Sequence, residues 1–259
     1  MASRSALTVL VLAALAALLA RSDAAPSTRV VKEARAAERS PTSASQARPA
    51  AEPAPAPKRA GLHQVAIVRG TVALRVRPGG RVLARAGART EFGGRRVLSV
   101  AARRGAWLGV IAPELPNGRL AWVDGESRAI QMRSTAYTLH ADLSERRLEL
   151  WKGRRVLRRV GVAIGRPGSE TPTGRFAVTD KLSGSRYGPY YGCCILALNG
   201  HQPKLPAGWA GGSRLAVHGT DAPGTIGAAA SAGCLRAADA DLQVLMRRVP
   251  LGTPVFIRD

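Results

Sequence analysis

The sequence predicts a mainly β protein with one short helix near its C-terminus. Short apolar segments, several with a period of two, are separated by Gly, Pro, Asn-Gly and Asp-Gly turns, a pattern typical of strands. Helical spacing is clear in a single place, where the apolar positions are Leu242, Leu245, Met246 and Val249. Asp239 is predicted to be the N-cap of this helix, and the helix is expected to end at Pro250.

The first 62 residues are predicted to lie outside the folded part. Arg4 is followed by an apolar run from Leu7 to Ala20 and then by small residues, the layout of a signal peptide over residues 1–24. The run is short for a membrane span, which needs roughly 20 apolar residues. Cleavage and secretion, or location in the cell envelope, are therefore expected, with an uncleaved anchor as the alternative. Residues 25–62, rich in Ala and Pro, are predicted to be a disordered linker.

The chain is strongly basic. Lys and Arg number 39 against 17 acidic residues, which gives a formal net charge of +22. Compositional drift alone is one explanation, and attraction to an anionic partner is the other. Nucleic acid, acidic membrane and cell-wall polymers all satisfy the charge. Export argues against nucleic acid and favours anionic cell-wall polymers.

Residues 63–133 are predicted to form a small β domain. Its turn signals are Pro78-Gly79-Gly80, Gly93-Gly94, Asn117-Gly118 and Asp124-Gly125. The last two are typical of tight hairpins. Short, closely spaced strands of this kind suit a small barrel.

The same segment resembles bacterial SH3-like domains. The resemblance rests on Gly105-Ala106-Trp107-Leu108 and on Gly118-Arg119-Leu120-Ala121-Trp122-Val123. It implies a module that binds the wall or a partner. A module that only spaces and supports the rest of the chain is the alternative.

Residues 136–259 are predicted to form a second β domain. Strands are expected at residues 139–142, 147–151, 156–164, 175–179, 215–217 and 254–257. Lys181–Trp209 shows little periodicity and is predicted to be a long functional loop, or a lid with some structure of its own. His218 directly follows the predicted strand 215–217.

Three cysteines in an exported chain leave at least one thiol unpaired within a monomer. Cys193 and Cys194 are adjacent, and a disulfide between sequence neighbours is strained, so we expect this pair to be reduced or packed. Cys234 stands alone beside Gly233 and is the better candidate nucleophile.

His218 and Cys234 together suggest a base and its nucleophile. A thiol with an ordinary pKa of about 8.5 is mostly protonated at neutral pH, and an imidazole can accept its proton. The backbone N–H groups of Gly233 and Cys234 could form an oxyanion hole, and Arg236 could pair with a substrate carboxylate. A packed histidine and a small buried cysteine are the alternatives. One Cys and one His without further ligand spacing do not predict a metal site.

The C-terminal segment resembles the L,D-transpeptidase catalytic domain family. The matching motifs, in the family's order, are Asp142–Leu148, Gly165–Pro167, Thr171–Phe176, His218–Thr220, Ile226-Gly227, Ser231–Arg236 and Val249–Val255.

The resemblance implies a β-sandwich fold for residues 136–259, preceded by the small SH3-like barrel. Cys234 would be the nucleophile, His218 its base, and the backbone carbonyl of Gly219 would orient the imidazole. Gly233 and Cys234 would supply the oxyanion-hole donors.

Four further residues receive substrate-binding roles from the resemblance. Ser231 and Arg236 would shape the site, and Tyr190 or Tyr191 would correspond to a lid tyrosine. One position departs from the family, because Ala232 stands where the family often has His. This departure affects the expected rate and acceptor preference and leaves the nucleophile and base in place.

The implied reaction is acyl transfer between peptidoglycan stem peptides, with no metal or organic cofactor. The thiolate attacks the third residue of a stem tetrapeptide, D-alanine leaves, and an amine on a neighbouring stem resolves the thioester as a 3→3 cross-link. A hydrolytic carboxypeptidase and an inactive wall-binding protein are the alternatives. The sequence leaves open the acceptor, the diamino acid of the wall and the oligomeric state.

Overall fold

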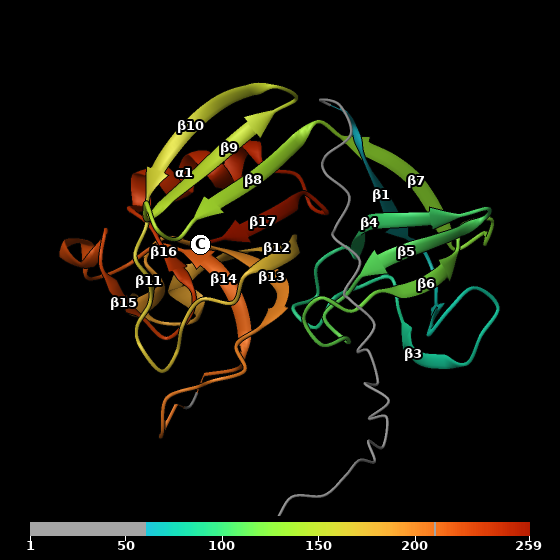
Figure 1. The fold of residues 1–259 in the computed structure, drawn as a ribbon, viewed down its shortest axis with the longest axis horizontal. Coiled ribbons are helices and arrows are strands. Elements are labelled where there is room, and N and C mark those ends of the chain that lie inside the picture. Colours follow the sequence, from blue (N-terminus) through green and yellow to red (C-terminus); the bar gives the residue numbers. More distant parts are fainter. Residues whose placement is uncertain (1–60, 210) are drawn as a thin grey trace, which may run out of the picture. The chain divides into compact units, whose positions relative to one another are not determined.

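The computed structural model describes residues 61–209 and 211–259. The predicted signal peptide, at residues 1–24, and nearly all of the predicted linker, at residues 25–62, lie outside the described residues. All described residues fall within one compact unit, Ala54–Asp259. The fold is mainly β, as the sequence predicts, with a single α-helix among the described residues (Figure 1).

The first seven strands form one antiparallel sheet, with the order β3-β2-β6-β5-β4-β1-β7. Side chains alternate across these strands, and those on the inner face make a separate apolar core that includes Leu74, Leu108 and Val110. The SH3-like identity and the boundaries 63–133 remain predictions. The strands are β1 (His63–Val68), β2 (Val72–Arg75), β3 (Val82–Ala86), β4 (Val97–Arg104), β5 (Trp107–Ile111), β6 (Ala121–Asp124) and β7 (Ile130–Thr135).

The two predicted tight hairpins are wrong. Residues 112–120 join β5 to β6, and residues 125–129 join β6 to β7, so neither connection is a two-residue turn. Asn117 instead reaches the second sheet, where its side chain accepts from the backbone N–H of His201 at 2.9 Å and donates to its carbonyl at 2.7 Å. The conformation of this loop therefore depends on the tertiary contact with His201 rather than on local turn geometry alone.

The remaining strands form an eight-stranded sheet with the order β10-β9-β8-β17-β12-β13-β14-β16 and a two-stranded parallel pair, β11-β15. The strands are β8 (Tyr137–Asp142), β9 (Arg147–Lys152), β10 (Arg155–Gly161), β11 (Ile164–Gly165), β12 (Gly174–Ser183), β13 (Cys194–His201), β14 (Arg214–His218), β15 (Ala229–Ser231), β16 (Leu235–Arg236) and β17 (Pro254–Arg258). The sheet encloses the larger core, with fully buried Phe176, Leu196 and Leu198 among its members.

The prediction of one loop over Lys181–Trp209 is wrong. β12 continues to Ser183, two 3₁₀ turns follow (η1, Gly184–Arg186, and η2, Pro189–Tyr191), and β13 then lies between β12 and β14 in the sheet. Seven of the eight residues of β13 are buried. A strand covered on both faces has an almost continuous apolar sequence, so it lacks the period of two that marks a half-exposed strand. The predicted strand over 156–164 likewise ends at Gly161, and Ile164 begins the separate β11.

The predicted helix is confirmed as α1 (Asp239–Arg248), which buries Leu242 and Leu245 in the larger core. Its N-cap is Ala238, without a side-chain hydrogen bond, so the predicted capping role of Asp239 is wrong. The carboxylate of Asp239 is used elsewhere, beside the candidate site.

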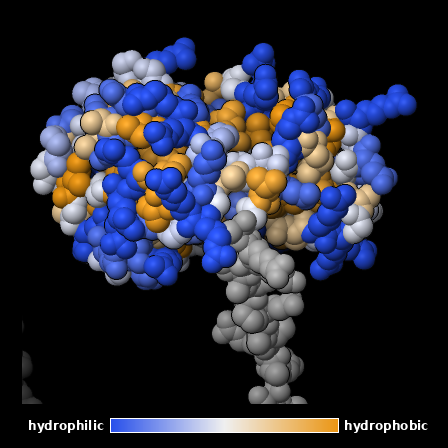
Figure 2. All heavy atoms as spheres, turned by 90° about the horizontal axis from the view of Figure 1, so that it is seen from above, coloured by the Kyte–Doolittle hydropathy of each residue, from blue (hydrophilic) through white to orange (hydrophobic). Residues whose placement is uncertain are grey.

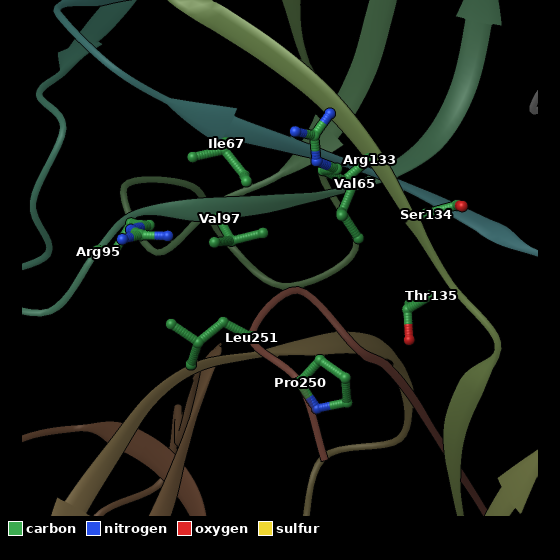
Figure 3. A pocket seen from close by; sticks show the side chains of 9 residues that line it. All are labelled: Val65, Ile67, Arg95, Val97, Arg133, Ser134, Thr135, Pro250 and Leu251. Atoms are coloured by element: carbon green, nitrogen blue, oxygen red, sulfur yellow. The ribbon is translucent and has the colours of Figure 1, made fainter. Parts of the chain in front are cut away.

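The larger of two pockets described, of about 530 Å³, lies away from the candidate site. Figure 3 shows it between Val65 and Val97 of the first sheet and the Pro250-Leu251 turn. Gly252 allows this close packing, because a Cβ there would lie 2.7 Å from Val97 Cγ1. None of the residues predicted to be catalytic lines this pocket.

The face drawn in Figure 2 is mostly hydrophilic, with small hydrophobic areas between the polar side chains. Within residues 61–209 and 211–259, no helix has the length and apolar character needed to cross a membrane.

Candidate active site

His218 is fully buried at the end of β14, where the strand backbone fixes its direction. Its Nδ1 lies 2.6 Å from the carbonyl oxygen of Gly219. A carbonyl can only accept, so in the neutral imidazole Nδ1 carries the proton and Nε2 has the free lone pair. Nε2 is buried and has no hydrogen-bond partner among the described residues. The predicted orienting role of Gly219 therefore has a direct geometric basis.

Burial strongly favours the neutral imidazole. Loss of solvation lowers the pKa of His218 from 6.5 to about 4, although the Gly219 carbonyl opposes this effect. At neutral pH, His218 is consequently an uncharged base rather than an imidazolium.

Cys234 is brought to the region of His218 because the strand that follows it, β16, runs beside β14. β14 and β16 are parallel, with Val217 opposite Leu235 and His218 opposite Arg236. Paired residues of neighbouring strands share a face of the sheet, so Arg236 lies on the face that carries His218, and Cys234 comes directly before β16. The topology thus brings together two residues that are distant in sequence.

The thiol of Cys234 is also held in its neutral form. Its Sγ lies 3.9 Å from the carbonyl oxygen of Arg214, which a thiol proton can approach. Burial raises the pKa of the Cys234 thiol to about 11, while the Ala216 backbone and the Arg236 charge act in the opposite direction. With these pKa values, the resting pair is a neutral thiol and a neutral imidazole rather than a thiolate and an imidazolium.

Ser231 organises the turn that presents Cys234. Its fully buried hydroxyl donates to the Cys234 carbonyl at 2.6 Å and accepts from the Gly233 N–H at 3.0 Å. The Gly233 N–H is therefore already engaged by Ser231, and its role as an oxyanion-hole donor stays a prediction. Of the two predicted donors, the Cys234 N–H has no such competing hydrogen bond in this turn.

Gly233 is a glycine for a packing reason. Its φ is +116°, and a Cβ there would lie 2.0 Å from Nε2 of Gln202. The Gln202 amide donates to the carbonyls of Glu170 at 2.9 Å and Ala232 at 3.3 Å, which ties two loops to the nucleophile turn. Sequence reasoning missed Gln202, and nothing local in the sequence singles it out.

Arg236 lies beside the site with its guanidinium over the ring of Tyr190, at 4.9 Å. It donates to the carbonyl of Ala230 at 2.6 Å, and its buried Nε has no partner. A guanidinium has five N–H donors, so donors remain for a carboxylate.

Tyr190 and Tyr191 both belong to η2 and both lie close to His218. Their ring centroids are 5.4 and 4.9 Å from the imidazole. Burial raises the pKa of both hydroxyls, so they are neutral and able to donate. The sequence proposed one or the other as a lid tyrosine, and the structure brings both together.

Asp239 is a second residue that sequence reasoning assigned differently. Its Oδ2 accepts from the Cys193 N–H at 3.0 Å, and its Oδ1 accepts from the Thr220 N–H at 3.3 Å. A Cβ on Gly219 would lie 2.1 Å from Oδ1. The carboxylate therefore joins the segment before β13 to the segment after His218.

Cys193 and Cys194 form a disulfide, which corrects the prediction that this pair is reduced or packed. The bond lies next to the site, since the Cys194 carbonyl accepts from the Gly219 N–H at 3.0 Å. Cys234 is the free cysteine of the chain. Within the described part of the chain, no three His, Cys, Asp or Glu side chains gather in a way that could hold a metal ion.

The fold and site define a mainly β domain that carries a buried imidazole and a neighbouring thiol. Residues 136–257 match the family model of the L,D-transpeptidase catalytic domain, YkuD. The resemblance predicted from the sequence is confirmed for this segment, which is slightly less than half of the chain.

The curated relatives include the Bacillus licheniformis protein named "Putative L,D-transpeptidase YkuD", which is 31% identical over 123 residues. The Bacillus subtilis protein named "Putative L,D-transpeptidase YqjB" is 33% identical over 107 residues. The first alignment covers 47% of this chain and 65% of that relative, and the second covers 38% and 57%. The matched segment thus spans less than two thirds of these relatives.

The solved structures that the chain matches include L,D-transpeptidase 3 from Mycobacterium tuberculosis in complex with a faropenem-derived adduct. It is 17% identical with a TM-score of 0.40, and the match covers 54% of this chain and 73% of that one. An L,D-transpeptidase from Mycobacterium smegmatis is 19% identical with a TM-score of 0.39, over 62% and 82% of the two chains.

Proposed function

We propose that this protein is a cysteine-dependent L,D-transpeptidase that joins peptidoglycan stem peptides by 3→3 cross-links. The observation that carries the proposal is the arrangement of His218. Its Nδ1–H is held by the Gly219 carbonyl, its Nε2 has no partner among the described residues, and the residue paired with it across the strands, Arg236, lies two positions after Cys234. This arrangement supports general-base activation of a thiol.

In the first half-reaction, Sγ of Cys234 attacks the carbonyl of the third stem residue while its proton passes to Nε2 of His218. Both groups favour their neutral forms, so the proton moves as the S–C bond forms rather than beforehand. The Cys234 N–H is available to the developing oxyanion. The C–N bond then breaks, D-alanine leaves with the proton from His218, and a thioester remains.

In the second half-reaction, an amine of a neighbouring stem attacks the thioester. His218 takes a proton from the attacking amine and returns it to the departing sulfur, which restores the neutral pair. Arg236 supports binding of the donor carboxylate, because its guanidinium is buried beside the site and has free donors.

The proposal includes a location outside the cytoplasm and contact with anionic wall polymers. Its support is the signal-peptide layout of residues 1–24 and the net charge of +22. The charge would concentrate the protein near a polyanion.

Intact-mass measurement tests the proposed nucleophile. The protein with a stem tetrapeptide or a carbapenem is expected to gain one acyl group, and Cys234→Ala is expected to gain none. A Cys193→Ser/Cys194→Ser double variant is the matched control and should still be acylated. An acyl group retained by Cys234→Ala, or an unlabelled wild-type protein, contradicts the proposal.

Product analysis tests the acceptor. With an added stem amine, peptide dimers are expected. Tripeptide alone, at all amine concentrations, would instead identify a hydrolytic carboxypeptidase.

A further inference from the structure

A row of aromatic side chains passes beside His218 and ends at the loop that joins β3 to β4 of the first sheet. The centroids of successive rings are 5.1 to 6.4 Å apart, within the range of favourable aromatic pairs. Three of the chain's four tyrosines take part, so the row concentrates a scarce residue type. In order, its members are Trp209, Tyr190, Tyr191, Tyr187 and Phe92.

Phe92 lies at the tip of a short loop, residues 90–94, between β3 and β4, and hydrogen bonds fix the conformation of this loop. The backbone closes on itself, since Thr90 N–H donates to the Gly94 carbonyl at 2.9 Å and Gly93 N–H to the Thr90 carbonyl at 3.0 Å. The Thr90 hydroxyl donates to buried Oδ1 of Asp180 on β12, at 2.5 Å. Gly94 lies so close that a Cβ would be 2.4 Å from the same oxygen. The loop tip is thus fixed against the second sheet.

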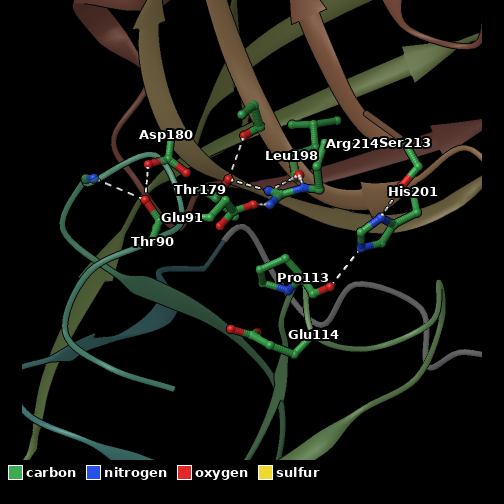
Figure 4. A network of polar contacts seen from close by, with 12 residues as sticks. Thr90, Glu91, Pro113, Glu114, Thr179, Asp180, Leu198, His201, Ser213 and Arg214 are labelled. Atoms are coloured by element: carbon green, nitrogen blue, oxygen red, sulfur yellow. Dashed lines mark hydrogen bonds and ion pairs between the residues drawn. The ribbon is translucent and has the colours of Figure 1, made fainter. Parts of the chain in front are cut away.

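A second attachment joins the 90–94 loop to β14, the strand that carries His218. Glu91 forms an ion pair with Arg214, as Figure 4 shows. The Arg214 side chain is only 14% exposed and also donates to the Leu198 carbonyl at 2.8 Å. The ring of Phe92 lies 5.6 Å from the same guanidinium.

Arg214 in turn lies beside the nucleophile, because its backbone carbonyl is the group 3.9 Å from Sγ of Cys234. The first sheet therefore reaches the site by two routes. One passes through Arg214 to Cys234, and the other through Tyr187 and Tyr191 to His218.

The rings of this row pack against one another, and each is also partly exposed to solvent. Tyr187 is 44% exposed, and Phe92, Tyr190, Tyr191 and Trp209 are each partly exposed. Rings that served only a core would be buried. A line of half-exposed rings beside a nucleophile can instead cover the aliphatic parts of a bound peptide.

We infer that Phe92, supplied by the first sheet, is a specificity-determining residue that extends the aromatic row over which the substrate's peptide stem binds. The inference rests on the proposed function. The first sheet is then part of the catalytic unit as well as a spacer or wall-binding module.

Steady-state kinetics of the full chain with a stem tetrapeptide test this role. Phe92→Ala is expected to raise KM about tenfold with kcat changed less than about twofold, because the ring contacts ground state and transition state alike. Phe92→Tyr keeps an aromatic ring at this position, so its KM should be close to that of the wild type. Leu83→Ala, which removes an exposed apolar side chain from the same sheet, is the matched control and should leave KM unchanged.

Acylation by a small carbapenem separates binding from chemistry, since it requires Cys234 and His218 and no extended stem. Phe92→Ala should be acylated at close to the wild-type rate. An unchanged KM, or an equal loss of carbapenem acylation, overturns the inference. If Phe92→Ala fails to fold, Phe92→Leu provides the same test. A wild-type protein that neither reagent acylates would refute the proposed function itself.

Discussion

Burial favours the neutral forms of both His218 and Cys234. The imidazole releases its proton at a pKa of about 4, and the thiol retains its proton to about 11. Over the range between these values, the pair is neutral and the base is unprotonated. The activation of sulfur therefore depends on transfer within the substrate complex rather than on a stored thiolate.

Acidification should destabilise the fold through His218. The unfolded imidazole binds a proton below pH 6.5, whereas the folded one resists protonation until about pH 4. The free energy of unfolding therefore falls as the pH decreases through this window, by about 3 kcal/mol for a shift of this size.

Urea unfolding at several pH values between 7 and 4 measures this effect. His63 and His140 also have lowered pKa values, so the wild-type slope includes them. The difference between wild type and His218→Gln isolates the site. Equal slopes for the two proteins would show that the buried imidazole is not responsible.

At the scale of elements, the site is assembled by strand ends and one helix start. β14 and β16 bring the base beside the nucleophile, and α1 places Asp239 where it holds the segments on both sides of the site. Asp239 at the helix start thus acts as a clamp, meaning that its carboxylate holds the segments around Cys193 and Thr220 together, and it does not cap the helix.

Asp239→Ala should loosen this clamp. Two backbone N–H groups lose their acceptor, so we expect a loss of about 2 kcal/mol in stability and a slower acylation of Cys234. Chemical denaturation and intact-mass kinetics measure the two effects.

Asp241→Ala is the matched control in the same helical turn. It removes the same charge from the helix start but breaks only a surface ion pair with Arg158, worth up to about 1 kcal/mol. Equal losses in both variants would mean that the helix charge, and not the clamp, is what matters.

At the scale of the whole described molecule, the two sheets are joined through polar contacts. Asp180 is 2% exposed, and the Thr90 hydroxyl is the partner of its Oδ1 (Figure 4). Its Oδ2 has no hydrogen-bond partner among the described residues. The hydrogen bonding of this buried carboxylate therefore depends on one threonine.

Thr90→Val should weaken this junction. It keeps the side-chain shape but leaves a buried carboxylate oxygen without a donor, at a cost of about 1–3 kcal/mol. Thermal unfolding measures the loss, and Thr71→Val, at an exposed position directly before β2, should be nearly neutral. An unchanged melting temperature for Thr90→Val would show that the contact carries no stability.

Much of the site was predictable because His218, Ser231, Cys234 and Arg236 sit in recognisable motifs. The two tyrosines were predicted as alternatives within a long loop, and both lie close to His218. Asp239, Gln202 and Arg214 escaped prediction because their partners are distant in the sequence. β13 was missed because burial on both faces removes the alternation that identifies a strand.

The sequence by itself determined the mainly β class, the helix near the C-terminus, the family resemblance and the identity of the candidate pair. Periodicity and local motifs depend on residues that are close together in the sequence, so they can be recognised without a structure. Only the tertiary structure decided the neutral protonation of that pair, the engagement of the Gly233 N–H, the Cys193–Cys194 bond and the approach of Phe92. Each of these depends on solvent exclusion or on contacts between segments far apart in the chain, which no local pattern encodes.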